Sequence, residues 1–417
     1  MVSARIISIG DELLCGRTVD TNASRTQRRL LAHGVPVHGV AVVPDTPEAI
    51  AVALDAVPEG SLVVMTGGLG PTPDDLTVDA VAAWSKLVLE VHLPTDIILR
   101  ERAADRGIPF GPNMVKQTLV PVGFEALNNP AGTAPGLIGD ALGRLLVLLP
   151  GVPIEVDALW PQVEQALIRR GVFGDAAPRV LRRTCGLSEP EVDRRTAPFK
   201  EMYPDLIWSW WLTRWGVDVQ VSTAGKQMLP QELCARLDAV LGEHVFAVDM
   251  IELNDVVVRN LQDRGWTLAL AESCTGGLVG GAITDVPGAS SVFLGGAVSY
   301  ADMVKSRFLD VPQDLLGEHG AVSEPVARAM AVGARSLFGS DVAMSVTGIA
   351  GPDGGTPGKP VGTTCIGLAS PFGVWSHRLR FQSFRIRNRE LAVAHVLDAL
   401  RRHLASGRSP WPDSIDQ

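Results

Sequence analysis

The chain has 417 residues, of which 46% are hydrophobic and 20% charged, and this is the composition of a globular protein. Its 37 basic and 46 acidic residues give a net charge of −9, which argues against direct nucleic-acid binding through a basic surface. Five scattered cysteines without a CxxC pair argue against a zinc ribbon or a disulfide scaffold. No apolar run approaches the roughly 20 residues of a membrane span, and the start lacks the apolar segment of a signal peptide. We therefore expect a cytoplasmic protein of about two to four domains.

Residues 1–170 alternate between predicted strands and helices. Short apolar runs predict strands at 4–9, 37–43, 61–66 and 144–149, and helical spacing predicts helices at 20–33, 47–57, 76–86 and 153–170. This order is typical of an α/β domain with a mostly parallel sheet covered on both faces. Ligands of such sheets bind at the carboxyl ends of strands, where the glycine-rich turns 67–71 and 150–153 lie.

Residues 171–250 are expected to form a small α+β module, joined to the first domain by a linker at 171–178. Strands are predicted at 179–185 and 217–223, and helices at 189–199 and 230–241. The module carries a tryptophan cluster. A strand would place Trp208 and Trp210 on one face, with Trp211 and Trp215 on the other. Packing of a sheet or domain contact is one interpretation of the cluster, and a stacking platform for a base is the other.

Residues 251–405 are expected to form a third, α/β domain. Helices are predicted at 253–264, 276–284, 324–338 and 386–404, and strands at 267–271, 292–300, 341–346, 361–369 and 374–381. The last two strands read as an antiparallel pair. The tail at 406–417, rich in Ser, Gly, Pro and Asp, is expected to be disordered.

Ser273 stands at a strand-to-helix corner and is followed by Thr275, Gly276 and Gly277. Glycines at such a corner let backbone amides approach a ligand, so the segment fits a phosphate site or an oxyanion hole beside a nucleophilic serine. A helix N-cap is the structural alternative for this serine.

A nucleophilic serine needs a base, and Lys305 is one candidate. The four histidines after residue 250 lie outside the glycine-rich turns, and Lys305 and Lys359 are the two lysines there. Ser-Lys pairs occur on unrelated folds, and a basic lysine needs desolvation or nearby positive charge. Lys305 follows a predicted strand and comes five residues after Tyr300. Spacing leaves open whether it is a base or a solvated surface lysine.

Two further groups in the third domain could bind a substrate. The glycine-rich turn 348–355 follows a predicted strand and is either a structural turn or a loop around a substrate. Arg385 and Arg389 are four residues apart near the start of the last helix. Both could reach one anion, or they could be surface arginines.

Carboxylates follow two strands of the first domain. Asp11 and Glu12 follow the first predicted strand, and Asp74 and Asp75 follow the turn 67–71. Oxygen ligands of this kind suit Mg²⁺ held partly by substrate phosphates, while turn capping and helix N-terminal charge are the structural alternatives.

Taken together, these motifs resemble the CinA family (competence/damage-inducible protein A) over residues 4–405. The amino-terminal domain of that family is matched by IGDELLCGRTVDTNA, TGGLGPTPDDLT, NNPAGTAPG and LLPGVPIE, in that order. The carboxy-terminal domain is matched by LAESCTGGLVGGAIT, GAVSYADMVK, HGAVSEPVA, SVTGIAGPDGG and KPVGTT, and GLSEPEVDRR is similar to the family's KH-like connecting module. The resemblance implies a three-layer molybdopterin-binding-like domain, a KH-like module at 171–250 and an α/β amidase domain.

The resemblance also implies a reaction for the carboxy-terminal domain. Related stand-alone proteins are nicotinamide-nucleotide amidases, which implies hydrolysis of nicotinamide mononucleotide to nicotinate mononucleotide and ammonia, without a cofactor. Ser273 matches the family's nucleophile, and Tyr300 and Lys305 match its activating pair. The amino-terminal domain resembles the family's ADP-ribose pyrophosphatase, which implies a divalent metal such as Mg²⁺ at Asp75. A homodimer is also implied.

The resemblance assigns substrate contacts in both domains. In the carboxy-terminal domain the matching residues are Thr275, Gly276, Gly277, Thr347, Gly348, Arg385 and Arg389. In the amino-terminal domain they are Asp11, Asn22, Gly67, Gly68, Gly70, Pro71, Thr72, Asp74, Gly132 and Thr133.

The chain departs from the family at two places in the carboxy-terminal domain. Ala301-Asp302-Met303-Val304 stands where the family commonly has Ser-Asn-Glu-Ala, and Ser383-Phe384 stands where it commonly has Gly-Asp. A negative charge at Asp302 near Lys305 would oppose loss of the lysine proton. Two alternatives to a bifunctional enzyme therefore remain. In one, the amino-terminal domain alone is active. In the other, the protein is non-catalytic and binds a partner in competence or the DNA damage response.

Overall fold

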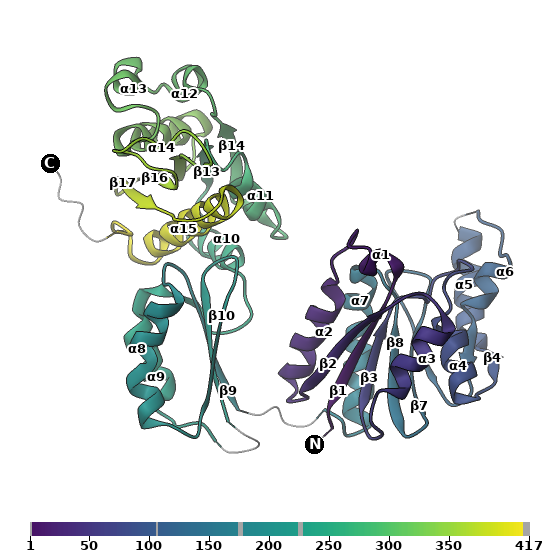
Figure 1. Cartoon of the computed structure of the whole chain (residues 1–417). Coiled ribbons are helices and arrows are strands. Elements are labelled where there is room, and N and C mark those ends of the chain that lie inside the picture. Colours follow the sequence, from purple (N-terminus) through teal and green to yellow (C-terminus); the bar gives the residue numbers. More distant parts are fainter. Residues whose placement is uncertain (1, 106, 174–177, 224–227, 412–417) are drawn as a thin grey trace. The chain divides into compact units, whose positions relative to one another are not determined.

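The computed structural model describes residues 2–105, 107–173, 178–223 and 228–411. The chain divides into two compact units, Met1–Ala177 and Pro178–Gln417 (Figure 1). Each unit is built around its own sheets, and each is described by itself below.

The first unit holds a six-stranded sheet in the order β2-β1-β3-β8-β7-β6. Strands β2, β1, β3 and β8 are parallel, while β7 and β6 are antiparallel to their neighbours. The strands are β1 (Ala4–Ile9), β2 (Val37–Val43), β3 (Leu62–Thr66), β6 (Glu125–Leu127), β7 (Gly136–Ala141) and β8 (Arg144–Leu149). A short antiparallel pair, β4 (Leu89–Val91) and β5 (Leu119–Pro121), lies apart from this sheet. The predicted strands of this region are confirmed to within one residue.

Helices cover both faces of this sheet, as the strand and helix order predicts. They are α1 (Asp11–Leu14), α2 (Thr21–Ala32), α3 (Pro47–Asp55), α4 (Thr77–Ser85), α5 (Leu93–Asp105), α6 (Pro112–Lys116) and α7 (Pro153–Arg169). Ile6 packs in one apolar cluster with Leu30 of α2 and Leu159 of α7, whereas the next residue, Ile7, packs in the other cluster with Ile50 of α3. The alternation of β1 side chains between two cores makes a three-layer α/β domain.

The second unit begins with a four-stranded antiparallel sheet in the order β10-β11-β9-β12. This middle module consists of β9 (Arg179–Thr184), α8 (Glu189–Met202), β10 (Ile207–Leu212), β11 (Val217–Ser222), α9 (Leu233–Leu241), the short helix η1 (Gly242–His244) and β12 (Val245–Ala247). The predicted face for Trp215 is wrong, because this residue lies beyond the end of β10, in the turn to β11. Trp208 and Trp210 pack beside the module's own apolar clusters, as the packing interpretation expects.

The rest of the second unit, the carboxy-terminal domain, holds a five-stranded sheet in the order β14-β13-β15-β16-β17. Strands β14, β13 and β15 are parallel, and β16 and β17 complete the sheet as an antiparallel pair. The strands are β13 (Leu268–Glu272), β14 (Phe293–Val298), β15 (Val342–Gly348), β16 (Thr363–Ser370) and β17 (Gly373–Arg380). The helices are α10 (Leu253–Arg264), α11 (Leu278–Thr284), η2 (Ala289–Ser291), α12 (Asp302–Leu309), α13 (Gln313–His319), α14 (Glu324–Phe338) and α15 (Arg385–Ser406).

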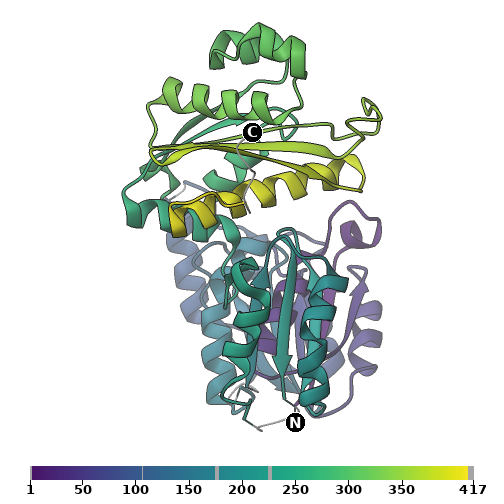
Figure 2. The same ribbon diagram turned by 90° about the vertical axis from the view of Figure 1, so that its left-hand side faces the viewer.

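The five-stranded sheet lies between two layers of helices. Figure 2 shows α14 and the yellow helix α15 on opposite faces of it. Leu270 of β13 packs in one apolar cluster with Leu261 of α10 and Leu397 of α15, and the next residue, Ala271, packs in another with Met330 of α14. This arrangement confirms the α/β class expected for the domain.

The two segments expected to be linker and tail are partly packed. Phe173 is buried and its ring stacks on His33, while residues 174–177 of the expected linker lie outside the described residues. Helix α15 extends to Ser406, and Trp411 stacks on His377 with ring centroids 5.6 Å apart. The expected disorder of the tail is therefore wrong up to residue 411, and residues 412–417 lie outside the described part. Across the described ranges, no helix combines the length and apolar character that crossing a membrane requires.

Candidate active site

Three parallel strands of the carboxy-terminal domain bring their carboxyl ends to one edge of the sheet. Ser273 directly follows β13, the segment from Ser299 to Lys305 follows β14, and Thr347 lies at the end of β15. Because the strands are adjacent and parallel, residues far apart in sequence meet at this edge.

Lys305 and Ser273 are brought together there. Lys305 lies on α12 and is 1% exposed, so the interpretation as a solvated surface lysine is wrong. Its Nζ donates to the carbonyl oxygens of Ser299 at 2.9 Å and Tyr300 at 3.1 Å, and lies 3.5 Å from Ser273 Oγ. A neutral amine has two N–H groups and one lone pair. It could keep both carbonyl contacts and direct the lone pair at the serine hydroxyl.

Asp302 lies in the same environment. Its Oδ1 is 3.5 Å from Lys305 Nζ, and the aspartate side chain is 62% exposed. Solvent screens this ion pair, because the carboxylate is largely exposed. The negative charge that the sequence places three residues before Lys305 therefore also lies close to its amine in space.

The phenol of Tyr300 lies away from this pair. Tyr300 is 63% exposed, and it is the backbone carbonyl of this residue that contacts Lys305. Within the described ranges, the Tyr300 hydroxyl makes no hydrogen bond to Ser273 or Lys305. The structure thus assembles two of the three predicted catalytic side chains.

Glu272 fixes the loop after Ser273, a role that the sequence analysis missed. One carboxylate oxygen, Oε2, accepts the amides of Gly277 at 2.9 Å and Val279 at 3.1 Å, and Oε1 accepts that of Gly280 at 2.8 Å. The only signal in the sequence is a carboxylate directly before a glycine-rich corner. These bonds occupy the amide of Gly277, which was expected to hold the oxyanion or the substrate.

Gly276 and Thr275 are the other two residues of the expected anion site, and the Gly276 amide is also engaged in a hydrogen bond within the protein. The Gly276 amide donates to the carbonyl of Ser273 at 3.1 Å. Thr275 is completely buried, and its hydroxyl oxygen lacks a hydrogen-bond partner in the part of the chain that the structure describes. Of the three expected residues, Thr275 therefore has an uncommitted polar group beside the serine.

The first turns of α15 hold the loops rather than presenting two free arginines. Arg389 donates to the carbonyls of Cys274 at 3.0 Å and Thr275 at 2.7 Å. Arg385 donates to the carbonyl of Gly351 at 2.7 Å, and Asn388 donates to that of Ala350 at 3.1 Å. Both arginines therefore donate to backbone carbonyls, and the substrate contact predicted for them stays a prediction.

Thr347 and Gly348 lie at the end of β15, next to the loop that follows Ser273. Thr347 is buried and its hydroxyl donates to the carbonyl of Ala321 at 3.0 Å. A Cβ at Gly348 would lie 3.0 Å from Cys274 Sγ, so a side chain does not fit without displacement. Burial raises the pKa of the Cys274 thiol to about 11, which keeps this thiol protonated near neutral pH.

In the first unit, the turn after β3 is tightly packed. Gly67 has φ 107° and Gly68 has φ 67°, in the region that favours glycine. A Cβ at Gly67 would overlap the carbonyl oxygen of Ile9, which ends β1. The Thr77 hydroxyl donates to the Gly67 carbonyl at 2.8 Å and holds α4 against the turn.

Thr72 and Asp75 form a closed loop at the end of this turn. Asp75 Oδ2 accepts the Thr72 amide at 2.8 Å and the Thr72 hydroxyl at 2.5 Å. Hydrogen bonding to Thr72 lowers the pKa of the exposed neighbour Asp74. A cavity beside the loop is lined by Gly68, Gly70, Asp75, Asp79, Lys116 and Gln117.

Asp45 joins the carboxylates at this edge of the sheet and was missed from the sequence. Its Oδ2 accepts the amide of Asp11 at 3.0 Å. Burial raises the pKa of Asp45, and Glu12, Asp11 and Asp74 add to the increase. Across the described residues, no three His, Cys, Asp or Glu side chains are placed to bind a metal together. Asp75 would fit the mode in which a single carboxylate shares Mg²⁺ with substrate phosphates.

The other predicted residues of the first unit serve neighbouring loops. Asn22 donates to the carbonyl of Gly151 at 2.7 Å, and the Gly132 amide donates to Asn129 at 3.0 Å. Thr133 lines a second cavity, which shares Pro135 with the first. Pro71 is exposed.

Two family models match separate parts of the chain. A family model described as the CinA C-terminal domain matches residues 250–404, and one described as a probable molybdopterin binding domain matches residues 5–170. A CinA-like protein of Geobacter metallireducens is 40% identical over 410 residues, 96% of this chain and 99% of that protein. A putative competence-damage inducible protein of Caldanaerobacter subterraneus is 37% identical over 411 residues, 96% of this chain and 98% of that protein.

Solved structures include the protein CinA of Thermoplasma acidophilum, which is 37% identical. The structural match covers 40% of this chain and 97% of the Thermoplasma chain, with a TM-score of 0.37. The sequence matches, which extend over nearly the whole chain, show that this protein belongs to the CinA family, with a molybdopterin-binding-like amino-terminal domain and a CinA carboxy-terminal domain.

Proposed function

We propose that the carboxy-terminal domain hydrolyses the carboxamide of nicotinamide mononucleotide. The observation that carries this proposal is the buried Nζ of Lys305 3.5 Å from Ser273 Oγ, at the carboxyl edge of a parallel sheet. The identity of the substrate comes from the resemblance to nicotinamide-nucleotide amidases, and the geometry supports the serine chemistry.

The proposed reaction proceeds in two halves. Neutral Lys305 takes the proton of Ser273, and Oγ attacks the carboxamide carbon. The carbon–nitrogen bond breaks, ammonia leaves with the proton from Lys305, and Ser273 carries the acyl group. Water then gives a proton to Lys305 and attacks the ester, which releases nicotinate mononucleotide, and Lys305 returns the proton to Ser273.

Burial and fixed contacts support this chemistry. The carbonyls of Ser299 and Tyr300 hold the lysine, and Glu272 and Arg389 hold the loop that carries the serine. Groups held in place before the reaction need little reorganisation in the transition state.

Ammonia release from nicotinamide mononucleotide tests this proposal. We expect wild type to release ammonia, Ser273→Ala to be inactive, and Cys274→Ala, which removes the adjacent buried thiol, to keep most of the activity. An inert wild type, or an active Ser273→Ala, would refute the mechanism.

For the amino-terminal domain we propose cleavage of the diphosphate of ADP-ribose. Asp75 would hold a divalent metal together with the substrate, and the metal would neutralise negative charge on the phosphates. The turn at Gly67 and Gly68, and the hydroxyl of Thr72, would lie against the phosphates. The test is Mg²⁺-dependent cleavage of ADP-ribose. We expect loss in Asp75→Asn, which can still accept the Thr72 bonds, and retention in Asp96→Asn, whose carboxylate pairs with Arg100.

One observation favours a second candidate, in which the amino-terminal domain alone is active. Asp302 Oδ1 lies 3.5 Å from Lys305 Nζ, so an ion pair occupies the nitrogen that the amidase mechanism needs as a base. Cleavage of ADP-ribose without amide hydrolysis would support this candidate. A stable partner and no turnover in either assay would instead support a non-catalytic role in competence or DNA damage.

We further propose that the protein is a cytoplasmic homodimer. A monomer in light scattering at working concentration would contradict the dimer.

A further inference from the structure

Helix α15 carries the residues that hold the loops of the candidate amidase site. Arg385, Asn388 and Arg389 contact the loops after β15 and β13 from the first turns of the helix. The placement of these first turns therefore decides where the loops lie.

Arg387 lies among these residues and faces the middle module instead. Its Nη2 donates to the carbonyl oxygen of Thr213 at 3.2 Å, and its Nη1 pairs with Glu390 Oε2 at 3.1 Å. The Arg387 side chain is 17% exposed, so the contact is shielded from solvent. Thr213 belongs to the turn between β10 and β11.

That turn is itself firmly fixed. The Thr213 amide donates to the carbonyl of Gly216 at 2.7 Å. Trp215 is 3% exposed and belongs to the apolar core of the carboxy-terminal domain, while its indole N–H donates to Glu252, the N-cap residue of α10. A Cβ at Gly216 would overlap the carbonyl oxygen of Thr184, so the turn packs closely on β9. The carbonyl that receives Arg387 thus has a fixed position.

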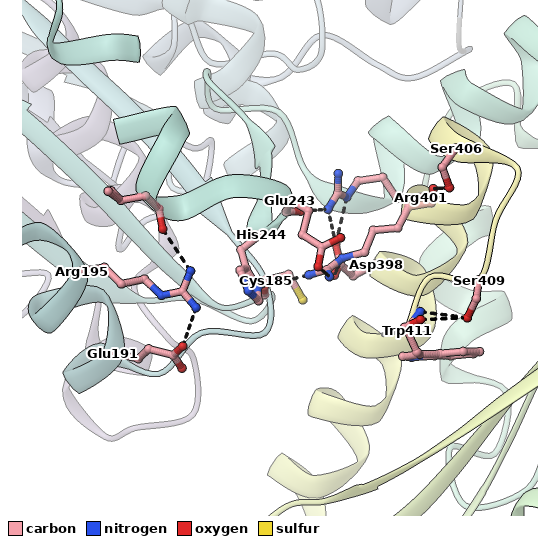
Figure 3. A network of polar contacts seen from close by, with 12 residues as sticks. Cys185, Glu191, Arg195, Glu243, His244, Asp398, Arg401, Ser406, Ser409 and Trp411 are labelled. Carbon is pink, nitrogen blue, oxygen red and sulfur yellow. Dashed lines mark hydrogen bonds and ion pairs between the residues drawn. The ribbon is translucent and has the colours of Figure 1, made fainter. Parts of the chain in front are cut away.

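The middle module also holds the far half of α15 (Figure 3). Arg401 donates to the carbonyl of Glu243 at 2.5 Å and pairs with Asp398 at 2.7 Å. Arg402 pairs with Glu243 at 2.8 Å and contacts His244 at 3.2 Å. The module therefore contacts the helix near both ends, and of these contacts the one at Arg387 lies among the residues that hold the loops.

We infer that the β10–β11 turn of the middle module is part of the framework of the amidase site, and that Arg387 is the positioning residue that joins them. Arg387 touches no reacting group. It fixes the first turns of α15, which in turn fix the backbone around Cys274, Thr275 and Gly351. The expected effect on kcat rests on the proposed amidase function. The expected effect on the position of the loops does not.

The test compares Arg387→Gln with Arg401→Gln in the full-length protein. The two arginines are matched, because each donates to one backbone carbonyl of the middle module and pairs with one carboxylate of α15. Hydrogen exchange of the amides in segments 273–280 and 347–352 is measured first. We expect exchange there to rise about tenfold in Arg387→Gln and less than about twofold in Arg401→Gln.

The kinetic arm uses nicotinamide mononucleotide. We expect Arg387→Gln to lower kcat about tenfold with KM nearly unchanged, and Arg387→Lys, which retains a donor, to recover most of the loss. Unchanged exchange in both segments, or equal effects of the two glutamine variants, would overturn the inference. If wild type does not hydrolyse the nucleotide, the proposed function fails, while the exchange arm still decides the inference.

Discussion

Lys305 Nζ lies 3.5 Å from Ser273 Oγ, and the contact joins the helix after β14 to the loop after β13. The lysine is surrounded by oxygen atoms: two backbone carbonyls, the serine hydroxyl and the carboxylate of Asp302. A buried cation without such partners would be strongly unfavourable, so these acceptors explain why the side chain can be buried. A lysine that acts as a base can keep the two carbonyl contacts and accept the serine proton at its lone pair.

Asp302 should restrain Lys305 through their ion pair. In Asp302→Asn we expect kcat/KM for amide hydrolysis to rise about two- to threefold, since the pair is lost and its carboxylate is largely exposed, which limits its strength. The measurement is kcat/KM for ammonia release from nicotinamide mononucleotide. Asp314→Asn, on the following helix, serves as the control and should leave kcat/KM unchanged. A fall of kcat/KM in Asp302→Asn would contradict the role given to this carboxylate.

Glu272 should be needed for both stability and turnover. Glu272→Gln replaces one carboxylate oxygen by an amide donor, which must face a backbone N–H that was bonded before. We expect the free energy of unfolding of the carboxy-terminal domain to fall by about 1–3 kcal/mol, together with a lower kcat. Urea denaturation and ammonia release measure the two effects. A variant as stable as wild type would show that the three amide bonds are dispensable.

The turn after β3 should not tolerate a side chain at Gly67. Gly67→Ala combines an unfavourable φ with overlap of the Ile9 carbonyl, whereas Gly16→Ala has a similar φ of 71° and open space around the new Cβ. We expect the first unit to lose about 1–3 kcal/mol more stability in Gly67→Ala than in Gly16→Ala. Hydrogen exchange of the β3 amides reports this difference. Equal losses would mean that the overlap is relieved at little cost.

His395 should make the second unit sensitive to acid. Burial lowers the pKa of His395 to about 4, and Arg402 contributes to the decrease while Asp398 opposes it. The unfolded state binds the proton at a pKa near 6.5, so the neutral imidazole contributes stability above that pH, and the contribution is lost as pH falls from 6.5 towards 4. We expect the loss to be about 2–3 kcal/mol at pH 4.

The matched variant for this titration is His395→Gln, which carries no titratable group. Chemical denaturation at pH 7, 5.5 and 4 should show a shallower decline of stability in the variant than in wild type. Parallel declines in the two proteins would show that His395 titrates normally in the folded state.

Much of the fold could be predicted from the sequence, because its signals are local. Strands such as Ala4–Ile9 and Arg144–Leu149 are continuous apolar runs, and helices such as Leu253–Arg264 carry a clear helical period, and all three coincide with the structure. The boundary at Trp215 could not be predicted, because that side chain leaves its own sheet to pack into the core of another domain.

The candidate site could be predicted by residue type but not by contact. Family motifs point to Ser273 and Lys305, yet the burial of Lys305 depends on the packing of α12 against α14 and the loops after β13 and β14. Arg389 looks like an anion ligand in the sequence, but the fold brings backbone carbonyls within its reach. Glu272 carries no marking in the sequence beyond its place before Ser273. Its role becomes visible in the fold, where the chain turns after Ser273 and brings three backbone amides to the Glu272 carboxylate.

Activation of Ser273 by Lys305 can be tested in a single variant, Lys305→Met. Methionine can fill the buried space without a titratable group, so the variant should stay folded. The measurement is kcat/KM for ammonia release from nicotinamide mononucleotide, with circular dichroism to confirm the fold. We expect kcat/KM to fall about 10²–10⁴-fold, the usual contribution of a general base. A folded Lys305→Met that hydrolyses the nucleotide at close to the wild-type rate would contradict this activation.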